Sequence, residues 1–371
     1  MAICIVVGTR PEIIKMSCIL HELAKKNVPF TLVHSGQHYD SNLSDVFFKE
    51  LDLPSPDINL EVGSGSQAGQ TASAMVKLES TFLEIHPDMV LVEGDTNTVL
   101  AGALASAKLG IKVGHVESGL RSYDLRMPEE HNRRLTDHLS AYLFAPTARA
   151  VETLRRESCW GKVILTGNTV IDACVLYGRK AEQRSSILNK VPHNGFALAT
   201  IHRAENVDNP QVLQEFLQIF SECPIPVVCA MHPRTVQRLR AQGLEPTLAH
   251  SENVTQIPPQ GYLDFLALLM HCQFVLTDSG GIQEEATAPN IRKKVFVLRD
   301  STERPEAVES GFAEVVGTNA SSILKRLRHF LNEPWNPPRA SPYGDGDSAL
   351  RIVSAIQRRN EGAETEPVLV N

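Results

Sequence analysis

The sequence predicts an α/β protein with two domains, each built around a parallel β-sheet. The first reason is length, because 371 residues are too many for one ordinary hydrophobic core and suit two domains of about 150–200 residues. The second is that short β-branched apolar runs alternate with helical patterns along the whole chain. Strands that alternate with helices form βαβ units, and these build parallel sheets.

The predicted strands are nearly continuous in apolar character, as expected for strands buried on both faces. In the first half they are residues 2–8, 30–36, 88–94 and 112–118, and in the second half 196–202, 226–232, 274–280 and 295–299. The pattern pauses near 165–173, so we expect the domains to join within 167–190.

We therefore expect an N-terminal domain over 1–168 and a C-terminal domain over 169–345. Residues 334–347 form a Pro/Gly-rich connector. An amphipathic helix over about 346–361 follows it.

Composition narrows the class of protein. The net charge of −7 argues against nucleic-acid binding, which needs a basic excess. The seven cysteines are odd in number and form no CxxC pair, which favours free thiols in a reducing compartment and no metal site. The start of the chain lacks a signal-peptide pattern, and no apolar run approaches a membrane span. We expect a cytoplasmic protein that does not bind membranes.

In open parallel sheets, ligands bind beyond the carboxyl ends of the strands. Two such domains facing each other would enclose a central cleft. After the first strand, Gly8 permits a tight turn, Pro11 suits a first helical turn, and Arg10 and Lys15 add positive charge. The alternative is a surface turn with a basic pair. Neither a dinucleotide-binding fingerprint nor a P-loop is present.

Residues 115–138 are unusually charged for a segment that follows a buried strand. Nine charged residues and two histidines occur between Glu117 and His138. Glu117 follows one predicted strand, and Asp95 follows the strand before it. Asp95 alone has an equally good interpretation as a helix N-cap. Two carboxylates at the ends of neighbouring strands suggest that a substrate meets them.

A helix is predicted to begin at Pro128, with Glu129 and Glu130 near its positive end. Leu135 and Leu139 are spaced for a core-facing side. Two pairs have i,i+4 spacing for ion pairs on the helix surface, namely Glu130 with Arg134 and Arg133 with Asp137. A charged, solvent-exposed helix explains these residues.

In the second half, two histidines stand at strand ends, namely His202 and His232. Two such histidines favour a binding or catalytic site over a structural role. In the segment 276–286, a strand runs into Ser279, Gly280 and Gly281 and then into a helix, an arrangement suited to a diphosphate. Glu284 and Glu285 follow about one turn later, where a carboxylate can accept from both hydroxyls of a ribose. The alternative is a simple turn with a capping serine.

Arg304 lies beside Pro305 at another predicted helix start and suits an anion. The cations, the glycine-rich turn and the carboxylates together suit a nucleotide diphosphate that carries a reacting group.

Nine motifs, in order, carry a resemblance to the non-hydrolysing UDP-N-acetylglucosamine 2-epimerases. They are GTRPEIIKM, GQHYD, EGDTNTVLAGALA, HVESGLRS, MPEEHNR, TGNTVIDA, IHRAEN, TDSGGIQEEA and RDSTERPEAVESG. The resemblance covers nearly the full length. It implies a GT-B-like fold of two Rossmann-like domains, with UDP in the cleft held mostly by the C-terminal domain. It also implies that the last helix returns to the first domain, that no cofactor is needed, and that the protein is a homodimer.

The resemblance further implies a reaction at C2 of a UDP-2-acetamido sugar, most simply UDP-GlcNAc to UDP-ManNAc. UDP would leave to give a 2-acetamidoglucal and then add back, which requires acid/base groups on both faces of the sugar. By motif, the acid/base candidates are Asp95, Glu117 and Glu129, with His202 near the diphosphate or sugar and Lys15 near the leaving group. The substrate-binding candidates are Arg10, His232, Phe265 (near uracil), Ser279, Gly280, Gly281, Glu285 and Arg304.

The chain departs from the family pattern at three places. It reads Ala204 where many bacterial members have arginine, and it has Tyr39-Asp40-Ser41-Asn42 where they carry a different run. In that family a second UDP-GlcNAc molecule acts as an activator at an adjacent site, and both changes argue against such activation in this chain. Arg126 precedes the PEE motif and suits a sugar carboxylate, as in the branch that acts on UDP-2,3-diacetamido-2,3-dideoxy-glucuronate.

Three other functions remain open. A hydrolysing 2-epimerase would release N-acetylmannosamine and UDP from the same site. A glycosyltransferase would need an acceptor groove, and the acidic set at 95, 117 and 129 argues against it. A nucleotide-sugar sensor would not need those carboxylates.

Overall fold

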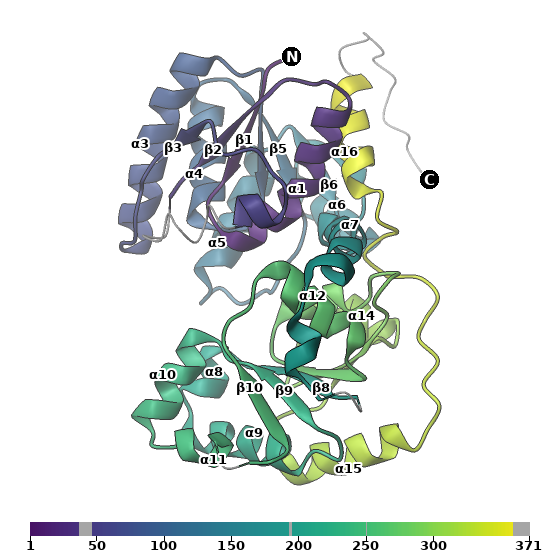
Figure 1. Ribbon diagram of the computed structural model, residues 1–371. Helices are drawn as coiled ribbons and strands as arrows, with labels where there is room; N and C mark the ends of the chain where they lie inside the picture. Colours follow the sequence, from purple (N-terminus) through teal and green to yellow (C-terminus); the bar gives the residue numbers. More distant parts are fainter. Residues whose placement is uncertain (37–46, 193–194, 250, 359–371) are drawn as a thin grey trace. The chain divides into compact units, whose positions relative to one another are not determined.

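The computed structural model describes residues 1–36, 47–192, 195–249 and 251–358. The chain divides into two compact units. The first comprises Met1–Ala173 and the C-terminal residues from Tyr343, and the second comprises Cys174–Pro342. Helices cover both faces of each sheet (Figure 1). The prediction of two parallel-sheet α/β domains is confirmed.

The first unit holds a seven-stranded sheet in the order β3-β2-β1-β4-β5-β6-β7, and all of its strand pairs are parallel. Its strands are β1 (Ile3–Val7), β2 (Phe30–His34), β3 (Ile58–Asn59), β4 (Met89–Glu93), β5 (Lys112–Val116), β6 (Tyr142–Ala145) and β7 (Lys162–Leu165). Its helices are α1 (Arg10–Lys25), α3 (Gln67–Ile85), α4 (Asn97–Lys108), α5 (Pro128–Leu139), α6 (Ala148–Arg156) and α16 (Ser348–Gln357).

Side chains on one face of this sheet form a core with two helices. Cys4 and Val6 of β1 pack with Leu78 and Phe82 of α3 and with Val99 of α4. Because side chains alternate along a strand, Ile3, Ile5 and Val7 point to the opposite face, where they are equally buried. This double burial explains why the strand sequences are apolar almost throughout.

The second unit holds a six-stranded parallel sheet in the order β10-β9-β8-β11-β12-β13. Its strands are β8 (Ala197–Thr200), β9 (Val227–Ala230), β10 (Val254–Ile257), β11 (Phe274–Thr277), β12 (Lys294–Val297) and β13 (Ala313–Val315). Its helices are α8 (Ala204–Val207), α9 (Pro210–Glu222), α10 (Pro233–Ala241), α11 (Glu245–Ala249), α12 (Tyr262–His271), α13 (Gly280–Glu285), α14 (Pro305–Glu309) and α15 (Ala320–Leu331), with a 3₁₀ turn at Ile187–Lys190.

Three aromatic rings mark the core of the second unit. Phe274, Phe296 and Phe330 meet edge to face, with ring centroids 5.2–5.8 Å apart. They come from two neighbouring strands and from α15, which they join to the sheet.

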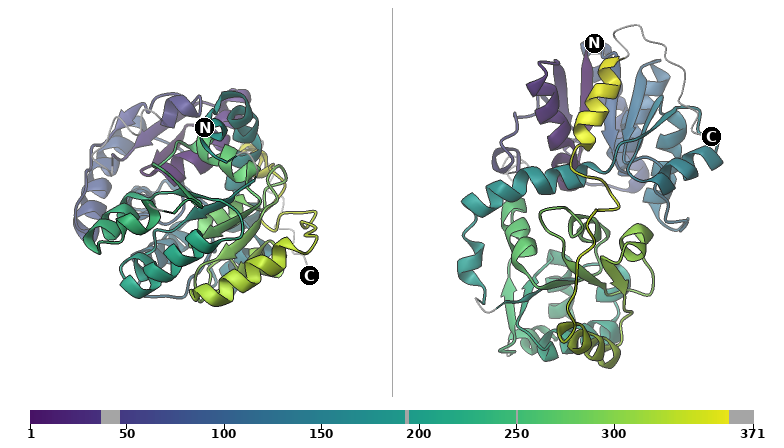
Figure 2. Two further views of the ribbon diagram at one scale, coloured as in Figure 1. Left: turned by 60° about the horizontal axis from the view of Figure 1, so that its bottom comes forward. Right: turned by 90° about the vertical axis from the view of Figure 1, so that its right-hand side faces the viewer.

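The C-terminal helix α16 belongs to the first unit. It lies beside α1 (Figures 1 and 2), and Lys26 at the end of α1 donates to Ser354 Oγ at 3.0 Å. The backbone N–H of Ala349 donates to the buried Asp172 at 2.7 Å. Asp172 lies in α7 (Thr169–Arg184), the helix that carries the chain from one unit into the other.

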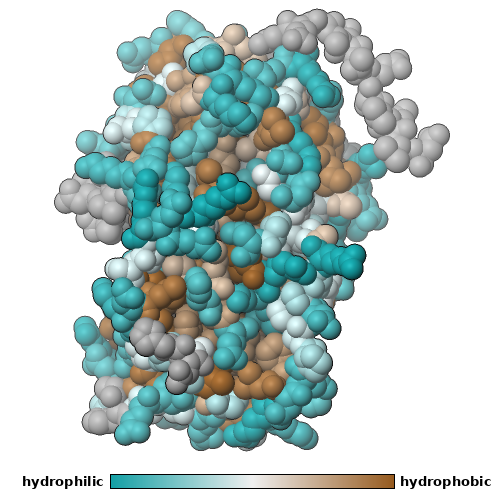
Figure 3. All heavy atoms as spheres, turned by 45° about the vertical axis from the view of Figure 1, so that its right-hand side comes forward, coloured by the Kyte–Doolittle hydropathy of each residue, from teal (hydrophilic) through white to brown (hydrophobic). Residues whose placement is uncertain are grey.

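The eight predicted strands all form, but the pattern missed β3, β6, β7, β10 and β13. These are short, and each carries at least one partly exposed residue, so their apolar signal is weak. The described cysteines are all free, as expected. None of the helices within the described ranges combines the length and apolar character needed to span a bilayer. The face in Figure 3 is mostly hydrophilic with scattered apolar patches, as on most folded proteins.

Candidate active site

In the first unit, the strand order reverses between β1 and β4. Connections from β1 run outward to β2 and β3, whereas those from β4 run to β5, β6 and β7 on the other side. Ligands of doubly wound sheets bind beyond the strands at such a switch point. The segments that follow β1, β4 and β5 therefore bring Lys15, Asp95 and Glu117 to one edge of the sheet.

Lys15 lies on α1 between two carboxylates. Its ammonium is 3.0 Å from Glu93 Oε1 and forms a short ion pair with Glu117 Oε2. Asn168 also donates to Glu117 Oε2, at 3.1 Å. All three ionisable side chains are largely buried, so their charges act on one another through little water. Residues 15, 93 and 117 thus form one buried charged cluster.

Glu117 occupies a left-handed backbone conformation, with φ of 68°. A non-glycine residue there costs roughly 1 kcal/mol. The turn ends at Gly119, where φ is 84° and a Cβ would lie 2.5 Å from the Ala150 carbonyl oxygen. The conformation turns the Glu117 side chain toward Lys15.

Gly8, which we expected to serve a tight turn, is required for a different reason. A Cβ at this position would lie 2.5 Å from both Ser35 Oγ and Thr98 Oγ1. Its backbone N–H donates to the buried Glu12 at 2.6 Å. Burial, above all, raises the pKa of Glu12 to about 7, against hydrogen bonds from Thr96, Gly8 and Thr9 that lower it.

The N-cap interpretation of Asp95 is wrong. Thr96 caps α4, and its Oγ1 accepts from the Val99 N–H at 3.4 Å. The Asp95 carboxylate instead accepts from Arg133, at 3.1 Å from Nε and through a shorter contact from Nη2. Asn132 Nδ2 donates to the Asp95 carbonyl oxygen at 3.0 Å. Both donors come from α5, which therefore positions Asp95.

The prediction that α5 is a charged, solvent-exposed helix is wrong for one of its sides, which is buried. Its buried residues are Glu130, Asn132, Thr136 and Asp137, whereas Leu135, expected in the core, is 53% exposed. Glu130 accepts from the Ser122 N–H at 2.8 Å and from Arg133 at 3.1 Å, not from Arg134. The buried side is polar because it meets polar turns after β4 and β5, and hydrogen bonds offset its burial.

Glu129, the acid/base candidate, is half-buried in the first turn of α5. Its neighbour Glu130 is fully buried and holds the 120–124 segment. The structure therefore brings Asp95, Glu117 and Lys15 to one edge of the first sheet. Glu129 lies on α5, the helix that positions Asp95.

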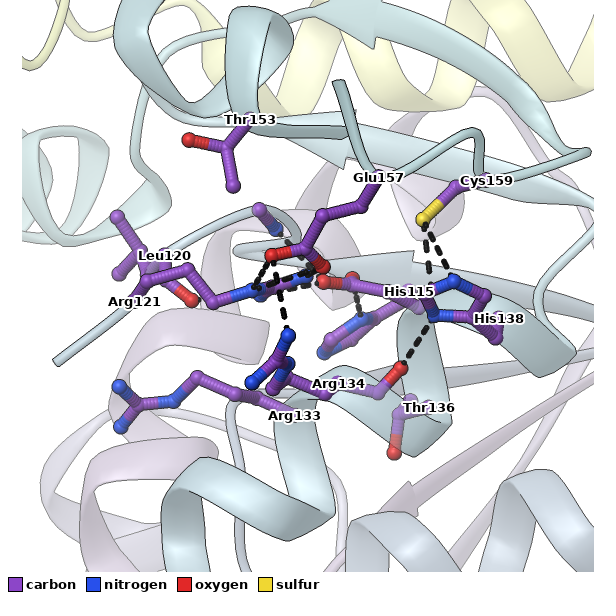
Figure 4. Close-up of polar contacts among 12 residues, drawn as sticks. His115, Leu120, Arg121, Arg133, Arg134, Thr136, His138, Thr153, Glu157 and Cys159 are labelled. Carbon is purple, nitrogen blue, oxygen red and sulfur yellow. Dashed lines mark hydrogen bonds and ion pairs between the residues drawn. The ribbon is translucent and has the colours of Figure 1, made fainter. Parts of the chain in front are cut away.

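Three of the nine charged residues between Glu117 and His138 belong to an ion-pair network with Glu157, namely Arg121, Arg134 and Asp137 (Figure 4). His115 Nδ1 lies 2.7 Å from Asp137, and its Nε2 lies 2.8 Å from the Gly94 carbonyl oxygen. Arg121 binds Asp137 at 2.7 Å and Glu157 through Nε and Nη2. Arg121 and Asp137 are thus buried and paired within the protein, and Asp137 also accepts from the Gly119 N–H at 3.2 Å, in the turn that carries Glu117.

Electrostatics agree with this structural role. Burial acts against the charge of Arg121, but hydrogen bonds and charge from Glu157 and Asp137 raise its pKa further. Burial likewise opposes the Glu157 carboxylate, and Arg121 holds the pKa of that group below its usual range. Breaking such a buried pair typically costs about 3–5 kcal/mol.

His138, Glu157 and Cys159 come within 4.8 Å of one another at the edge of this network. The three residue types are possible metal ligands. However, Arg121 and Arg134 already pair with Glu157, and their positive charge opposes a cation. Burial also raises the pKa of the Cys159 thiol to about 11, so it is not a ready thiolate ligand. We assign no metal to this group.

Arg10 opens α1, and its guanidinium lies over the Phe47 ring, 4.2 Å from the centroid. A groove of about 570 Å³ runs between α3, α4 and α5 and includes Arg126, His131 and Asn132. Arg126 is paired with Asp124 at 2.8 Å. The departure at Tyr39–Asn42 lies outside the described residues.

In the second unit, the strand order reverses between β8 and β11. His202 and Asp278 follow these two strands. His202 Nδ1 lies 3.2 Å from Asp278 Oδ1, and Asp278 also accepts from the backbone N–H of His202 and Arg203 and from Asn206 Nδ2. Burial opposes the charge of Asp278, but His202 and these donors lower its pKa. An ionised, buried carboxylate thus orients the histidine, as in other acid/base pairs.

His232 is the N-cap of α10, and its Nδ1 accepts from the Arg234 N–H at 3.2 Å. Its ring centroid lies 5.2 Å from that of His202. Burial, followed by the charges of His202 and Arg234, lowers its pKa. The two histidines predicted at separate strand ends therefore form one pair, in which His232 is suited to be neutral.

Two guanidinium groups lie near the glycine turn after β11. A Cβ at Gly280 would be 3.8 Å from Arg304 Cζ and 3.9 Å from Arg203 Nη2. A Cβ at Gly281 would meet nothing within 4 Å. Ser279 precedes them and donates its N–H to Thr277 Oγ1 at 3.0 Å. The space and charge suit an anionic ligand.

The carboxylates of α13 divide their roles. Glu284 is buried and pairs with Arg304 at 2.6 Å, whereas Glu285 is half-buried. Glu303 pairs with Arg203 and Arg299. Burial opposes its charge, but Arg299 and Arg203 lower the pKa of Glu303 to about 2. Phe265 lies half-buried on α12 of the same unit.

Sequence reasoning missed several residues of these sites, among them Glu93, Glu130 and Asp278. Glu93 and Asp278 stand at or directly after strand ends, so their position was a usable signal. Glu130 had no such signal in the sequence, because its burial depends on which side of α5 meets the edge of the sheet.

Comparisons with known proteins identify the family of this chain. The family model described as UDP-N-acetylglucosamine 2-epimerase matches residues 21–357. A UDP-N-acetylglucosamine 2-epimerase of Methanocaldococcus jannaschii is 43% identical over 368 residues, covering 96% of this chain and 99% of that protein. A UDP-2,3-diacetamido-2,3-dideoxy-D-glucuronate 2-epimerase of Pseudomonas aeruginosa is 36% identical over 365 residues, covering 96% and 100%.

The crystal structure of the M. jannaschii UDP-GlcNAc 2-epimerase, in complex with UDP-GlcNAc and UDP, superposes with a TM-score of 0.87 at 43% identity, covering 96% of this chain and 100% of that one. Two doubly wound parallel sheets and this match define a GT-B-like fold. The coverage and identity then settle the membership: the chain belongs to the UDP-N-acetylglucosamine 2-epimerase family.

Proposed function

We propose that this protein interconverts UDP-GlcNAc and UDP-ManNAc by epimerisation at C2. The carrying observation is that Lys15, Glu117 and Asp95 lie at one edge of the first sheet, each held by a named partner. The M. jannaschii relative, whose structure contains UDP-GlcNAc, supports the choice of substrate.

The proposed reaction begins with departure of UDP from C1 and removal of the C2 proton, which gives a 2-acetamidoglucal. A proton then returns to the other face of C2, and UDP adds back to C1. Asp95, Glu117 and Glu129 are the acid/base candidates. Glu117 and Asp95 are held by different cations, Lys15 and Arg133, so each carboxylate has its own partner. Such an exchange requires more than one acid/base group.

The second unit would bind the UDP group. Arg304 and Arg203 would meet the diphosphate near Gly280, and the pair of His202 and His232 would lie beside it. Ser279, Gly281, Glu285 and Phe265 complete the candidate set there, and Arg10 adds a cation from the first unit. We assign most of the acid/base groups to residues 1–168 and UDP binding to residues 169–345.

Two further assignments belong to this proposal. Free cysteines throughout the described chain support a reducing compartment, and we place the enzyme in the cytoplasm. The family resemblance leads us to propose a homodimer, which light scattering of the purified protein would test.

A second candidate substrate is UDP-2,3-diacetamido-2,3-dideoxy-glucuronate. Arg126 supports it, because this arginine borders the groove beside α5 and a guanidinium binds carboxylates well. Against it, Asp124 already pairs with the Nε and Nη2 edge of that guanidinium. UDP-GlcNAc is therefore the first choice.

The test is incubation of the purified protein with UDP-GlcNAc in D₂O, followed by NMR. We expect UDP-GlcNAc and UDP-ManNAc, both deuterated at C2. Free N-acetylmannosamine with UDP would indicate a hydrolysing enzyme. Unchanged UDP-GlcNAc would overturn this substrate, and the same incubation with the diacetamido-uronate would then test the second candidate.

A further inference from the structure

Glu93 is a buried carboxylate that the proposed mechanism does not use. It is the last residue of β4 and is 1% exposed. In the parallel register, Glu93 stands opposite Val116, the residue before Glu117. The ends of two neighbouring strands thus place these two carboxylates next to each other.

Lys15 is the cation that both carboxylates share. Its ammonium has a 3.0 Å contact with Glu93 and a short contact with Glu117. Glu12 lies one turn earlier on the same helix, also buried. The charged groups that act on Glu93 are therefore Lys15 and Glu12 from α1 and Glu117 from the turn after β5.

These neighbours decide the charge of Glu93. One ammonium cannot fully compensate two buried carboxylates, because an uncompensated buried charge is costly. Burial raises the pKa of Glu93 well above its ordinary value, Lys15 lowers it, and Glu117 and Glu12 raise it further. With a proton on Glu93, Lys15 and Glu117 form a neutral pair, and the uncharged Glu93 carboxyl group still lies 3.0 Å from the Lys15 ammonium.

We propose that Glu93 is a positioning residue that controls the Lys15–Glu117 pair. When Glu93 is protonated, it holds the ammonium against Glu117. When Glu93 is ionised, it competes with Glu117 for that ammonium. This inference rests on the function proposed above, because Glu117 and Lys15 are candidates for that reaction. The consequence is that kcat should fall at alkaline pH as Glu93 loses its proton, which gives the pH profile of kcat an alkaline limb.

Two substitutions separate positioning from packing. Glu93→Gln imitates the protonated carboxyl, so we expect kcat within about twofold of the unmodified enzyme at neutral pH and loss of the alkaline limb. Glu93→Leu removes the contact with Lys15 and is expected to lower kcat about tenfold at every pH, with KM within twofold. Glu22→Gln is the matched control, since Glu22 also pairs with lysines of α1 but lies away from the strand ends.

A Glu93→Gln enzyme that keeps the alkaline limb would overturn the proposal, as would a Glu93→Leu enzyme with unchanged kcat. A second readout needs no substrate. In ¹⁵N-lysine NMR, the Lys15 resonance, assigned by its absence in Lys15→Arg, should move as Glu93 titrates and should lose that movement in Glu93→Gln. If the unmodified protein does not epimerise UDP-GlcNAc, the proposed function fails. The NMR titration still decides the role of Glu93, and an unchanged Lys15 response in Glu93→Gln would refute it.

Discussion

Arg133 holds Asp95 through two nitrogens of one guanidinium, with Nε 3.1 Å from Oδ2 and Nη2 in closer contact with the same oxygen. The two residues are 38 positions apart, and their contact joins the end of β4 to the middle of α5. An aspartate that sequence alone equally well explains as a helix cap is thereby fixed at the switch point of the sheet.

Arg133→Lys should lower kcat about 10–100-fold while leaving UDP affinity within twofold. A lysine supplies one point charge and cannot reproduce the fork that orients Asp95. Steady-state kinetics and UDP calorimetry measure the two quantities. Arg351→Lys is the control, since Arg351 forms a similar two-nitrogen pair with Asp345 on the surface. Equal losses in both variants would contradict the positioning role of Arg133.

Asp278→Asn should lower kcat by at least about 100-fold and leave the His202 ring without its orienting charge. The amide would turn an N–H group toward one of the donors that Asp278 now accepts from, so we also expect a loss of about 1–3 kcal/mol in the free energy of unfolding. Histidine NMR would report the tautomer of His202, and urea denaturation the stability. Asp208→Asn, in an exposed pair with Arg234 and Arg238, provides the comparison. An unaltered His202 spectrum would disprove the orienting role of Asp278.

Stability should fall as pH rises because of Glu12. Its pKa rises from an ordinary value of 4.5 to about 7 on folding, so the folded state binds more protons between these two values. The free energy of unfolding therefore decreases through that interval, by about 3 kcal/mol for this group. Glu12→Gln should flatten the dependence, as measured by urea denaturation at several pH values. A slope identical to that of the unmodified protein would refute this assignment.

Gly8→Ala should destabilise the protein by roughly 1–3 kcal/mol, because the added methyl meets Ser35 and Thr98 at 2.5 Å. Gly65→Ala is the control, since a Cβ there has no neighbour within 4 Å. Thermal unfolding of both variants tests the difference. If both are equally stable, the close approach around Gly8 is not the reason for the glycine.

Arg121→Met should cost about 3–5 kcal/mol of stability, because it leaves Asp137 and part of Glu157 buried without their main cation. Arg134→Met removes a more exposed guanidinium at 3.7 Å from Glu157 and should cost less than 1 kcal/mol. Chemical denaturation distinguishes the two, and similar losses would show that burial of the network contributes little.

The two parallel-sheet domains could be predicted from the sequence alone, as could the segments after the strands that carry Lys15, Asp95, Glu117 and His202. Strands buried on both faces require continuous apolar runs, and chemistry in such sheets gathers where those runs end, so both are local signals. Short strands such as β7 and β13 gave too little apolar signal to be seen.

The partners of the charged residues could not be predicted from the sequence, because they depend on the three-dimensional packing. The spacing of α5 suggested surface pairs and a core-facing Leu135, yet the helix buries Glu130 and Asp137 and exposes that leucine. Glu93 with Lys15, and Asp278 with His202, are likewise joined across neighbouring elements. The energy of a charge depends on its surroundings in space, which residue type and spacing do not specify.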